Sequence, residues 1–352
     1  MKGGNKKRIL VRTPNWVGDA VMTLPALESL KRLYGGSEIT LLAKKKVIPV
    51  YERNPAVKGI IEYGEDFKGL AGRFRLSGRL RTKKFQLAVL FQNAFDAAFI
   101  SFISRIPERA GYSRDMRGGL LTIPVRFSDE VKRLHHVFYY LRIIEALGGS
   151  RYGEAAPKIY LSEGERLDAK EFLREKGLGG APLIGASPGA SYGPAKMWPP
   201  ERFARVLIRL SGELGAVPIV FGGPDDIEAS EKVFEMVEKE RPGGLNLAGK
   251  ISLRRFMALA SMLRLFIAND SGPMHIAAAL GLPTVAIFGS TDPRLTGPQG
   301  GNVRVLIKDT SCSPCFERKC RYGHYRCLTS ITAEEVYSEA AELLSRVEDY
   351  EV

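Results

Sequence analysis

The sequence predicts an α/β protein made of two similar layers of parallel sheet and helix. Short apolar runs typical of strands alternate with helix-like runs, and the same alternation restarts in the second half of the chain. The 352 residues also exceed a usual domain of about 150. With 45% hydrophobic and 26% charged residues, the composition argues against disordered, collagen-like and coiled-coil chains.

The first half begins with a short β-rich run at residues 8–12. A turn-like stretch at 13–19 follows, and residues 20–33 then place leucines at helical spacing. The remaining expected elements are strands at 38–42 and 85–91 and an apolar helix at 94–103. Strands that alternate with helices form parallel sheets covered on both faces.

The second half repeats this alternation. Strands are expected at 182–186, 217–221, 265–268 and 284–288. Helices are expected at 200–210, after 224, at 274–280 and at 332–346, where Thr332 and Glu335 form a capping-box pattern.

Polar, glycine-bearing stretches at 148–153 and 163–180 separate the halves. We therefore expect domains at 1–165 and 166–352, with the terminal helix free to pack back on the first domain. Because ligands bind outside the carboxyl ends of parallel strands, two such domains facing across a cleft would both contribute loops to one site.

The net charge of +13 favours an anionic partner: nucleic acid, nucleotide, phosphorylated glycan or membrane surface. No aromatic-interleaved motif, zinc-finger spacing or helix-turn-helix supports nucleic acid. No apolar run approaches the roughly 20 residues of a membrane span, and the N-terminus lacks a signal-peptide pattern, so we expect a cytoplasmic protein.

Asp19 lies after the first expected strand, near the start of a helix. A carboxylate there could deprotonate a hydroxyl, but on spacing alone helix capping is the better explanation of an aspartate at this position. No GxGxxG pattern accompanies it, so a dinucleotide fingerprint is not supported.

Two later loops could bind phosphate. Residues 187–199 combine glycine and serine with Lys196, but they form no Walker A motif, and an ordinary surface loop is an equal alternative. Residues 269–275 lie between a strand and a helix, where Asp270, Ser271, Gly272 and His275 favour an anion site over simple capping.

The basic run at 73–84 could clamp phosphates, although a solvated surface is the commoner outcome for such a run. The four cysteines are Cys312, Cys315, Cys320 and Cys327, with His324 among them. Their clustering suggests a structural zinc site, with two disulfides or free thiols as the alternatives.

Three segments resemble the ADP-heptose:lipopolysaccharide heptosyltransferases of glycosyltransferase family 9, and most closely the heptosyltransferase II branch. They are TPNWVGDAVMTLPAL (13–27), PGASYGPAKMWPPERF (188–203) and NDSGPMHIAAALGLPTVAIFGSTDP (269–293). The resemblance extends over about residues 8–345 in the same order and spacing.

This resemblance implies the GT-B fold, with two Rossmann-like domains facing across a cleft. It also implies inverting transfer of L-glycero-D-manno-heptose from ADP-heptose to a heptosyl-Kdo-lipid A acceptor of the lipopolysaccharide inner core. The family requires no metal for catalysis. A different donor or acceptor sugar, or a non-catalytic nucleotide- or RNA-binding protein, are the alternatives.

By the same resemblance, Asp19 matches the general base and Lys196 the lysine that binds the diphosphate. The expected donor contacts are Ser191, Asp226, Ile251, Asp270, Ser271, Gly272 and His275; many relatives have Glu near position 226. The expected acceptor contacts are Asn15, Arg73, Arg75 and Arg79. The positive charge then suits peripheral contact with an anionic inner membrane at its cytoplasmic face.

Overall fold

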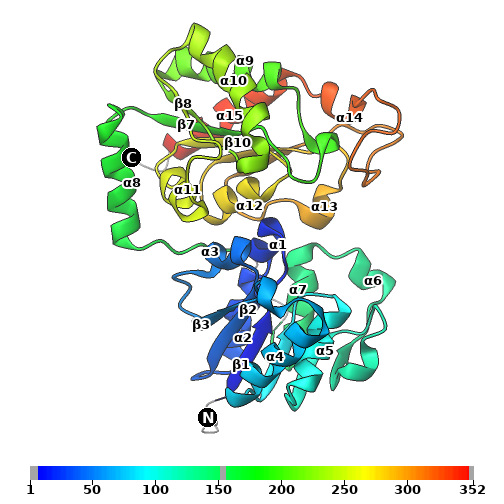
Figure 1. The fold of residues 1–352 in the computed structure, drawn as a ribbon. Helices are drawn as coiled ribbons and strands as arrows, with labels where there is room; N and C mark the ends of the chain where they lie inside the picture. Colours follow the sequence, from blue (N-terminus) through cyan, green and yellow to red (C-terminus); the bar gives the residue numbers. More distant parts are fainter. Residues whose placement is uncertain (1–6, 151–155, 349–352) are drawn as a thin grey trace. The chain divides into compact units, whose positions relative to one another are not determined.

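The structure is a computed structural model that describes residues 7–150 and 156–348 (Figure 1). The chain divides into two compact units, Met1–Tyr160 and Leu161–Val352. The expected division lay after residue 165. Assignment of the acceptor to the first domain and of the nucleotide sugar to the second stays a prediction.

Unit 1 contains a parallel six-stranded sheet in the order β3-β2-β1-β4-β5-β6. Its strands are β1 (Arg8–Arg12), β2 (Glu38–Ala43), β3 (Val57–Glu62), β4 (Leu87–Leu90), β5 (Glu108–Tyr112) and β6 (Ile123–Val125). Its α-helices are α1 (Val17–Met22), α2 (Leu24–Leu33), α3 (Ile48–Tyr51), α4 (Gly69–Thr82), α5 (Phe95–Ile103), α6 (Asp129–Lys132) and α7 (His136–Glu145).

Unit 2 has a second parallel six-stranded sheet, in the order β12-β11-β10-β7-β8-β9. Its strands are β7 (Leu183–Ser187), β8 (Val217–Val220), β9 (Leu245–Asn246), β10 (Leu265–Asn269), β11 (Thr284–Ile287) and β12 (Val303–Leu306). Its α-helices are α8 (Glu163–Glu175), α9 (Pro200–Leu214), α10 (Ile227–Glu240), α11 (Leu253–Ala260), α12 (Gly272–Ala279), α13 (Pro293–Thr296), α14 (Arg326–Thr329) and α15 (Ala333–Glu348).

Both sheets have the same topology once the strands are counted from the start of each unit. In unit 1 the strand order reverses between β1 and β4, and in unit 2 it reverses between β7 and β10. Each sheet is therefore a complete doubly wound layer, whose ligand-binding crevice is expected at this reversal. The first strands of the units are buried because neighbouring strands and helices cover them, which explains the apolar residues 9–11 and 183–186.

Helix α8 corrects the expectation that residues 163–180 form part of a polar link. Only Ala169 and Leu173 are buried in this helix, so it lacks the broad apolar stripe that predicts a helix from sequence. A capping box of Ser162 and Glu165 begins it instead.

The terminal helix α15 packs within unit 2. It contacts α9 and strands β10, β11 and β12. Its residues Val336, Ala340, Leu343 and Leu344 belong to the hydrophobic core of that unit. No helix of the described residues is both long and apolar enough to cross a bilayer.

Replacing Glu165 with glutamine is expected to lower the free energy of unfolding by about 1–3 kcal/mol. Arg254 donates from Nε and Nη2 to the two Glu165 oxygens, at 2.7 Å each, and thereby joins α8 to α11. This ion pair, with help from Ser162, lowers the pKa of Glu165 to about 2. A depressed folded-state pKa stabilises the protein above the unfolded value, so this contribution disappears as the pH falls from about 4.5 towards 2.

Urea unfolding of the wild type and of Glu165→Gln at pH 7 and at low pH checks this expectation. The two proteins should differ at pH 7 and converge under acid conditions. Equal stability at pH 7 would contradict the assigned role of the ion pair.

Candidate active site

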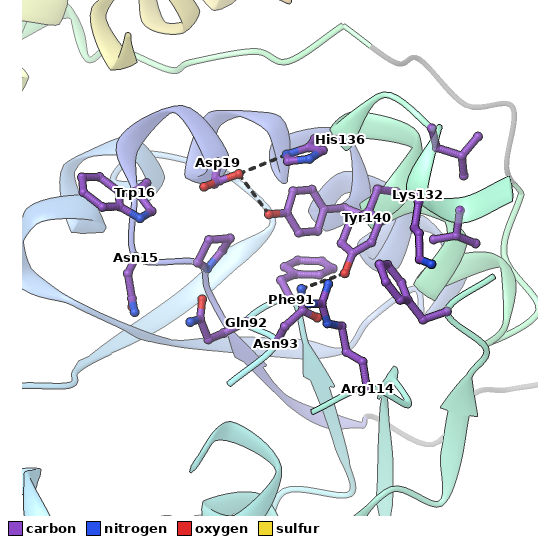
Figure 2. Close-up of a pocket in the computed structure, with 15 residues that line it drawn as sticks. Asn15, Trp16, Asp19, Phe91, Gln92, Asn93, Arg114, Lys132, His136 and Tyr140 are labelled. Carbon is purple, nitrogen blue, oxygen red and sulfur yellow. Dashed lines mark hydrogen bonds and ion pairs between the residues drawn. The ribbon is translucent and has the colours of Figure 1, made fainter. Parts of the chain in front are cut away.

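Asp19 lies at the reversal point of the unit 1 sheet. Helix α1 follows β1 directly and places Asp19 in its first turn, while α7 packs beside α1. From α7, the Tyr140 hydroxyl donates to Asp19 Oδ1 at 3.4 Å, and His136 Nδ1 lies 3.4 Å from the same oxygen (Figure 2). The Asp19 side chain remains 26% exposed, so a substrate hydroxyl can reach it.

Tyr140 is the buried partner of this carboxylate. Burial raises the pKa of its phenol well above the usual value, and the neighbouring Asp19 charge raises that pKa further. The hydroxyl therefore stays protonated and remains a hydrogen-bond donor to Asp19 at neutral pH. The side chain of His136, which faces the same Asp19 oxygen, is more exposed to solvent, at 39%.

A pocket of about 390 Å³ opens beside Asp19. Segments that follow β1 and β4 form one part of its lining. Arg114 after β5, Phe127 after β6, and residues within and beside α6 and α7 form the rest. The lining residues are Pro14, Asn15, Trp16, Asp19, Phe91, Gln92, Asn93, Arg114, Phe127, Val131, Lys132, Leu134, His136, Tyr139 and Tyr140. This mixture of aromatic rings, amides and cations suits a polar ligand of sugar size.

Two cations of the pocket share one aromatic ring. Arg114 Cζ lies 4.4 Å from the centroid of Phe127, and Lys132 Nζ lies 5.7 Å from it. Figure 2 shows Arg114 and Lys132 on one side of the view and Asn15 and Trp16 on the other. The pocket therefore offers positive charge as well as the Asp19 carboxylate.

Buried arginines hold the loops of this pocket in place. Arg117 donates to the carbonyls of Tyr112 and Gln92 and to Asn93 Oδ1, at 2.8, 2.5 and 3.0 Å. Arg12 donates to Asn15 Oδ1 at 3.2 Å. Burial lowers the pKa of Arg117 to about 10, so it still carries its charge at neutral pH.

Lys196 and Asp270 meet at the reversal point of the unit 2 sheet. Lys196 follows β7 and Asp270 follows β10, and these two strands are neighbours. Lys196 Nζ lies 2.5 Å from Asp270 Oδ2, and the Thr291 hydroxyl donates to the same oxygen at 2.5 Å. The side chains of Lys196 and Asp270 are only 12% and 4% exposed. We call the Lys196, Asp270 and Thr291 side chains, together with the N-terminus of α12, the anion cradle.

Polar groups of the cradle are available to a ligand. The Ser271 side chain makes no capping hydrogen bond to α12, and its hydroxyl is among the buried side-chain atoms without a partner in the described part of the chain. Gly272 and Pro273 begin the helix, whose free N–H groups and positive dipole end favour an anion. His275 is buried within α12, 5% exposed.

Asp226 lies against the loop that carries Lys196. A Cβ atom added at Gly189 would lie 2.1 Å from Asp226 Oδ1, so the two segments are in close contact. The Asp226 carboxylate accepts from the Gly223 N–H at 2.9 Å. Burial raises its pKa, and the nearby Asp225 charge raises it further.

Replacing Gly189 with alanine is expected to reduce affinity for ADP, because the added Cβ must displace the Asp226 side chain and the Lys196 loop. Overpacking of this kind costs about 1–3 kcal/mol. If the whole cost falls on the ligand-bound state, the affinity for ADP decreases by about 5- to 150-fold. Calorimetric titration with ADP measures this effect. Gly180→Ala is the matched control because a Cβ there meets nothing within 4 Å. Unchanged ADP affinity in Gly189→Ala would contradict a role for this contact.

The remaining predicted site residues are more dispersed. Asn15 lines the Asp19 pocket, whereas Arg73, Arg75 and Arg79 lie on α4 and are not among its lining residues. Ser191 is exposed in the Lys196 loop, and Ile251 precedes α11. The roles of all these residues stay predictions.

The four cysteines line one small cavity of about 20 Å³. No disulfide joins any of these four cysteines. In the described ranges 7–150 and 156–348, no group of three or more His, Cys, Asp or Glu side chains is arranged to hold a metal ion. The zinc prediction stays a prediction, which metal analysis of the purified protein can check.

The sequence comparison decides the family. Residues 73–326 match the sequence profile of glycosyltransferase family 9 (heptosyltransferase). The chain belongs to glycosyltransferase family 9. It is 32% identical to lipopolysaccharide heptosyltransferase 2 of Salmonella typhimurium, over 96% of this chain and 99% of that protein. The corresponding Escherichia coli protein is 31% identical, over 97% and 99%.

Solved structures of family 9 proteins have the same fold. E. coli ADP-heptose lps heptosyltransferase II superposes with a TM-score of 0.82 at 29% identity, covering 97% of this chain and 99% of that one. A glycosyltransferase family 9 structure from Veillonella parvula gives a TM-score of 0.83 at 29% identity, covering 97% and 98%.

Family membership and the two six-stranded parallel sheets confirm the predicted GT-B class. They also confirm the prediction that the chain is a glycosyltransferase rather than a non-catalytic binding protein. The general-base, donor and acceptor roles of individual residues stay predictions.

Proposed function

We propose that this family 9 enzyme transfers L-glycero-D-manno-heptose from ADP-heptose to a heptosyl-Kdo-lipid A acceptor, with inversion at the anomeric carbon, in lipopolysaccharide inner-core biosynthesis. The observation that carries the proposal is the likeness to lipopolysaccharide heptosyltransferase 2 over 96% of the chain at 32% identity. The Asp19 pocket and the anion cradle supply the chemistry that such a transfer needs.

In this proposal Asp19 is the general base. Its carboxylate takes the proton of an acceptor hydroxyl bound in the 390 Å³ pocket, and the oxygen attacks the anomeric carbon. Tyr140 and His136 face one carboxylate oxygen, which leaves the other available for the acceptor. Attack from the face opposite the diphosphate gives inversion.

The anion cradle stabilises the leaving ADP. As the glycosidic bond breaks, negative charge grows on the diphosphate, which an ammonium and oriented N–H groups stabilise. Lys196 is already desolvated and held by Asp270, so it is positioned before the donor arrives. The Ser271 hydroxyl and the first N–H groups of α12 add donors. In this scheme the Lys196 ammonium, the Ser271 hydroxyl and the N–H groups of α12 stabilise the leaving group.

The acceptor is anionic and anchored in a membrane, which suits a chain of net charge +13. We propose peripheral association with the cytoplasmic face of the inner membrane. The exposed basic residues of α4 are candidates for contacting acidic head groups or acceptor phosphates.

Product analysis tests the proposal. The purified protein is incubated with ADP-heptose and a series of core acceptors truncated after Kdo, after the first heptose and after the second. The proposal predicts one heptose added to the acceptor that carries a single heptose, with inverted anomeric configuration. Transfer only to the acceptor that ends in Kdo, or only from another nucleotide sugar, would overturn the assignment.

A further inference from the structure

The positive charge of the chain belongs to unit 1. Residues 1–160 contain 29 Lys and Arg against 14 Asp and Glu, whereas residues 161–352 contain 23 against 25. The net charges of the two units are thus +15 and −2. Residues 67–95 alone contain seven Lys and Arg and no Asp or Glu. An anionic partner is therefore attracted to unit 1, and to this segment in particular.

Helices α4 and α5, which flank the basic segment, cover one face of the unit 1 sheet. The two helices contact each other (Figure 1). Leu76 and Leu80 of α4 and Ala98 and Ile100 of α5 belong to one hydrophobic core with residues of β1, β2, β3 and β4. Because these sides of the helices face the sheet, the opposite sides face solvent.

The solvent-facing sides of α4 and α5 carry large apolar side chains. The exposed fractions are 65% for Leu70, 58% for Phe74, 48% for Phe95 and 47% for Phe102. Leu70 and Phe74 are four residues apart, and Phe95, Phe99 and Phe102 also follow helical spacing, so each helix presents an apolar stripe. The rings of Phe95 and Phe99 stack with their centroids 6.1 Å apart. Apolar side chains gathered on a surface in this way are typical of a contact site.

Arginines accompany both stripes. Arg75 and Arg79 are exposed on α4, four residues apart. Beside α5, Arg109 Cζ lies 5.4 Å from the centroid of the Phe102 ring. Arginine next to exposed phenylalanine and leucine is the composition of helices that lie in a membrane interface. We call the following side chains the α4–α5 face: Leu70, Phe74, Arg75, Arg79, Phe95, Phe99 and Phe102.

The α4–α5 face begins at the edge of the sheet that holds the Asp19 pocket. Phe95 is the first residue of α5, and Asn93, two residues earlier, lines that pocket. Strand β4, which precedes α5, pairs with β1, which precedes Asp19. A surface that contacts the α4–α5 face therefore lies close to the acceptor pocket.

We propose that the α4–α5 face docks unit 1 on an anionic lipid bilayer. Leu70 and the phenylalanines enter the interfacial layer of the bilayer, while Arg75 and Arg79 bind acidic head groups. This inference rests on the proposed function only for the purpose of the docking, which is to bring a membrane-anchored acceptor to the Asp19 pocket.

Two other occupants fit the α4–α5 face less well. A second copy of the chain would bring two units of net charge +15 together, and like charges repel. Nucleic acid would bind the arginines through its phosphates, but it offers no apolar layer for aliphatic side chains such as Leu70. A bilayer with acidic head groups satisfies both the charged and the apolar side chains.

Vesicle sedimentation with the full-length protein tests the docking without any need for transfer activity. One set of vesicles mixes phosphatidylglycerol with phosphatidylcholine, and the other contains phosphatidylcholine alone. We expect the wild type to bind the anionic vesicles about tenfold or more tightly than the neutral ones, and to bind them less tightly as salt is added. Phe74→Trp should bind as the wild type does, and brominated acyl chains should quench the fluorescence that it adds.

Serine and glutamine substitutions test the two parts of the face separately. The double variant Leu70→Ser with Phe74→Ser is expected to bind anionic vesicles about tenfold or more weakly, and Arg79→Gln about fivefold more weakly. Leu167→Ser and Arg166→Gln are the matched controls, because both residues are exposed on α8 of unit 2. Both controls should bind like the wild type. The wild-type and Phe74→Trp measurements still decide the question if the double variant folds poorly.

Several outcomes would overturn the inference. One is equal binding of the wild type to anionic and neutral vesicles, and another is unchanged binding by the Leu70→Ser, Phe74→Ser double variant. A third is Phe74→Trp fluorescence that brominated lipid does not quench. Loss of single-stranded RNA binding, or of a dimer, in the double variant with vesicle binding intact would assign the face to that partner instead.

Transfer assays separate this inference from the proposed function. The double variant should transfer heptose to a deacylated, water-soluble acceptor as the wild type does, and should be slower only with the acceptor embedded in vesicles. Equal rates of the two proteins on the embedded acceptor would contradict the purpose assigned to the docking. Failure of the wild type to transfer to either acceptor would count against the proposed function, whereas its vesicle binding would still support the docking.

Discussion

Replacing Asp19 with asparagine is expected to lower kcat for heptose transfer by about 10²- to 10⁴-fold, the usual contribution of a general base. Asparagine preserves the size of the side chain and can still hydrogen bond to Tyr140, but it cannot take a proton from the acceptor hydroxyl. The ADP affinity should stay within about twofold, because the anion cradle lies in the other unit. Steady-state kinetics and calorimetric ADP titration measure the two quantities.

Asp168→Asn is the matched control for this experiment. Asp168 is an exposed aspartate of α8, so its replacement removes the same charge without touching either site. Its kcat should equal that of the wild type. If Asp19→Asn retained full transfer activity, Asp19 would have to be removed from the mechanism.

Replacing Lys196 with methionine is expected to weaken ADP binding by about 30-fold or more. Loss of one partner of a buried charge pair costs about 2–5 kcal/mol. The substitution removes the ammonium that attracts the diphosphate, and it leaves the Asp270 carboxylate in place to repel it. Adenosine, which has no diphosphate, should bind the variant and the wild type with similar affinity.

A double substitution separates these two effects. Lys196→Met with Asp270→Asn removes the repelling carboxylate, so part of the lost ADP affinity should return. Lys170→Met, at an exposed position of α8, should bind ADP like the wild type. Equal losses for ADP and adenosine in Lys196→Met would show that Lys196 acts on the fold of the loop rather than on phosphate.

The positions of Asp19, Lys196 and Asp270 could be predicted from sequence because each follows a strand in a strand–loop–helix pattern. This pattern is local, and the topology of a doubly wound sheet then brings the ends of neighbouring strands together. The pairing of Lys196 with Asp270 follows from β7 lying beside β10.

The supporting residues could not be predicted in this way. Arg117 and Tyr140 reach the Asp19 pocket from β5–β6 and α7, and their role depends on tertiary contacts that no local pattern encodes. For Thr291 the sequence offered a weak indication of a site, because residues 290–292 lie between a strand and the helix that begins at Pro293. Buried arginines carry no distinguishing local sequence, because an arginine on a strand or in a loop is usually exposed.

Helices α4 and α8 were missed for a different reason. Neither has a wide apolar face: α4 buries Gly72, Leu76, Ser77 and Leu80, and α8 buries only Ala169 and Leu173. Apolar residues at helical spacing are a weak signal in charged helices such as these. Capping residues such as Ser162 were the better signal for α8.

The most direct test of the account is a crystal structure of the protein with a non-transferable ADP-heptose analogue. We expect the diphosphate to contact Lys196 Nζ and the first N–H groups of α12. We also expect the Asp19 carboxylate to lie on the opposite side of the anomeric carbon, with space between them for an acceptor hydroxyl at about 3 Å from the carboxylate. A bound analogue with its diphosphate away from Lys196, or with its anomeric carbon out of reach of Asp19, would contradict the account.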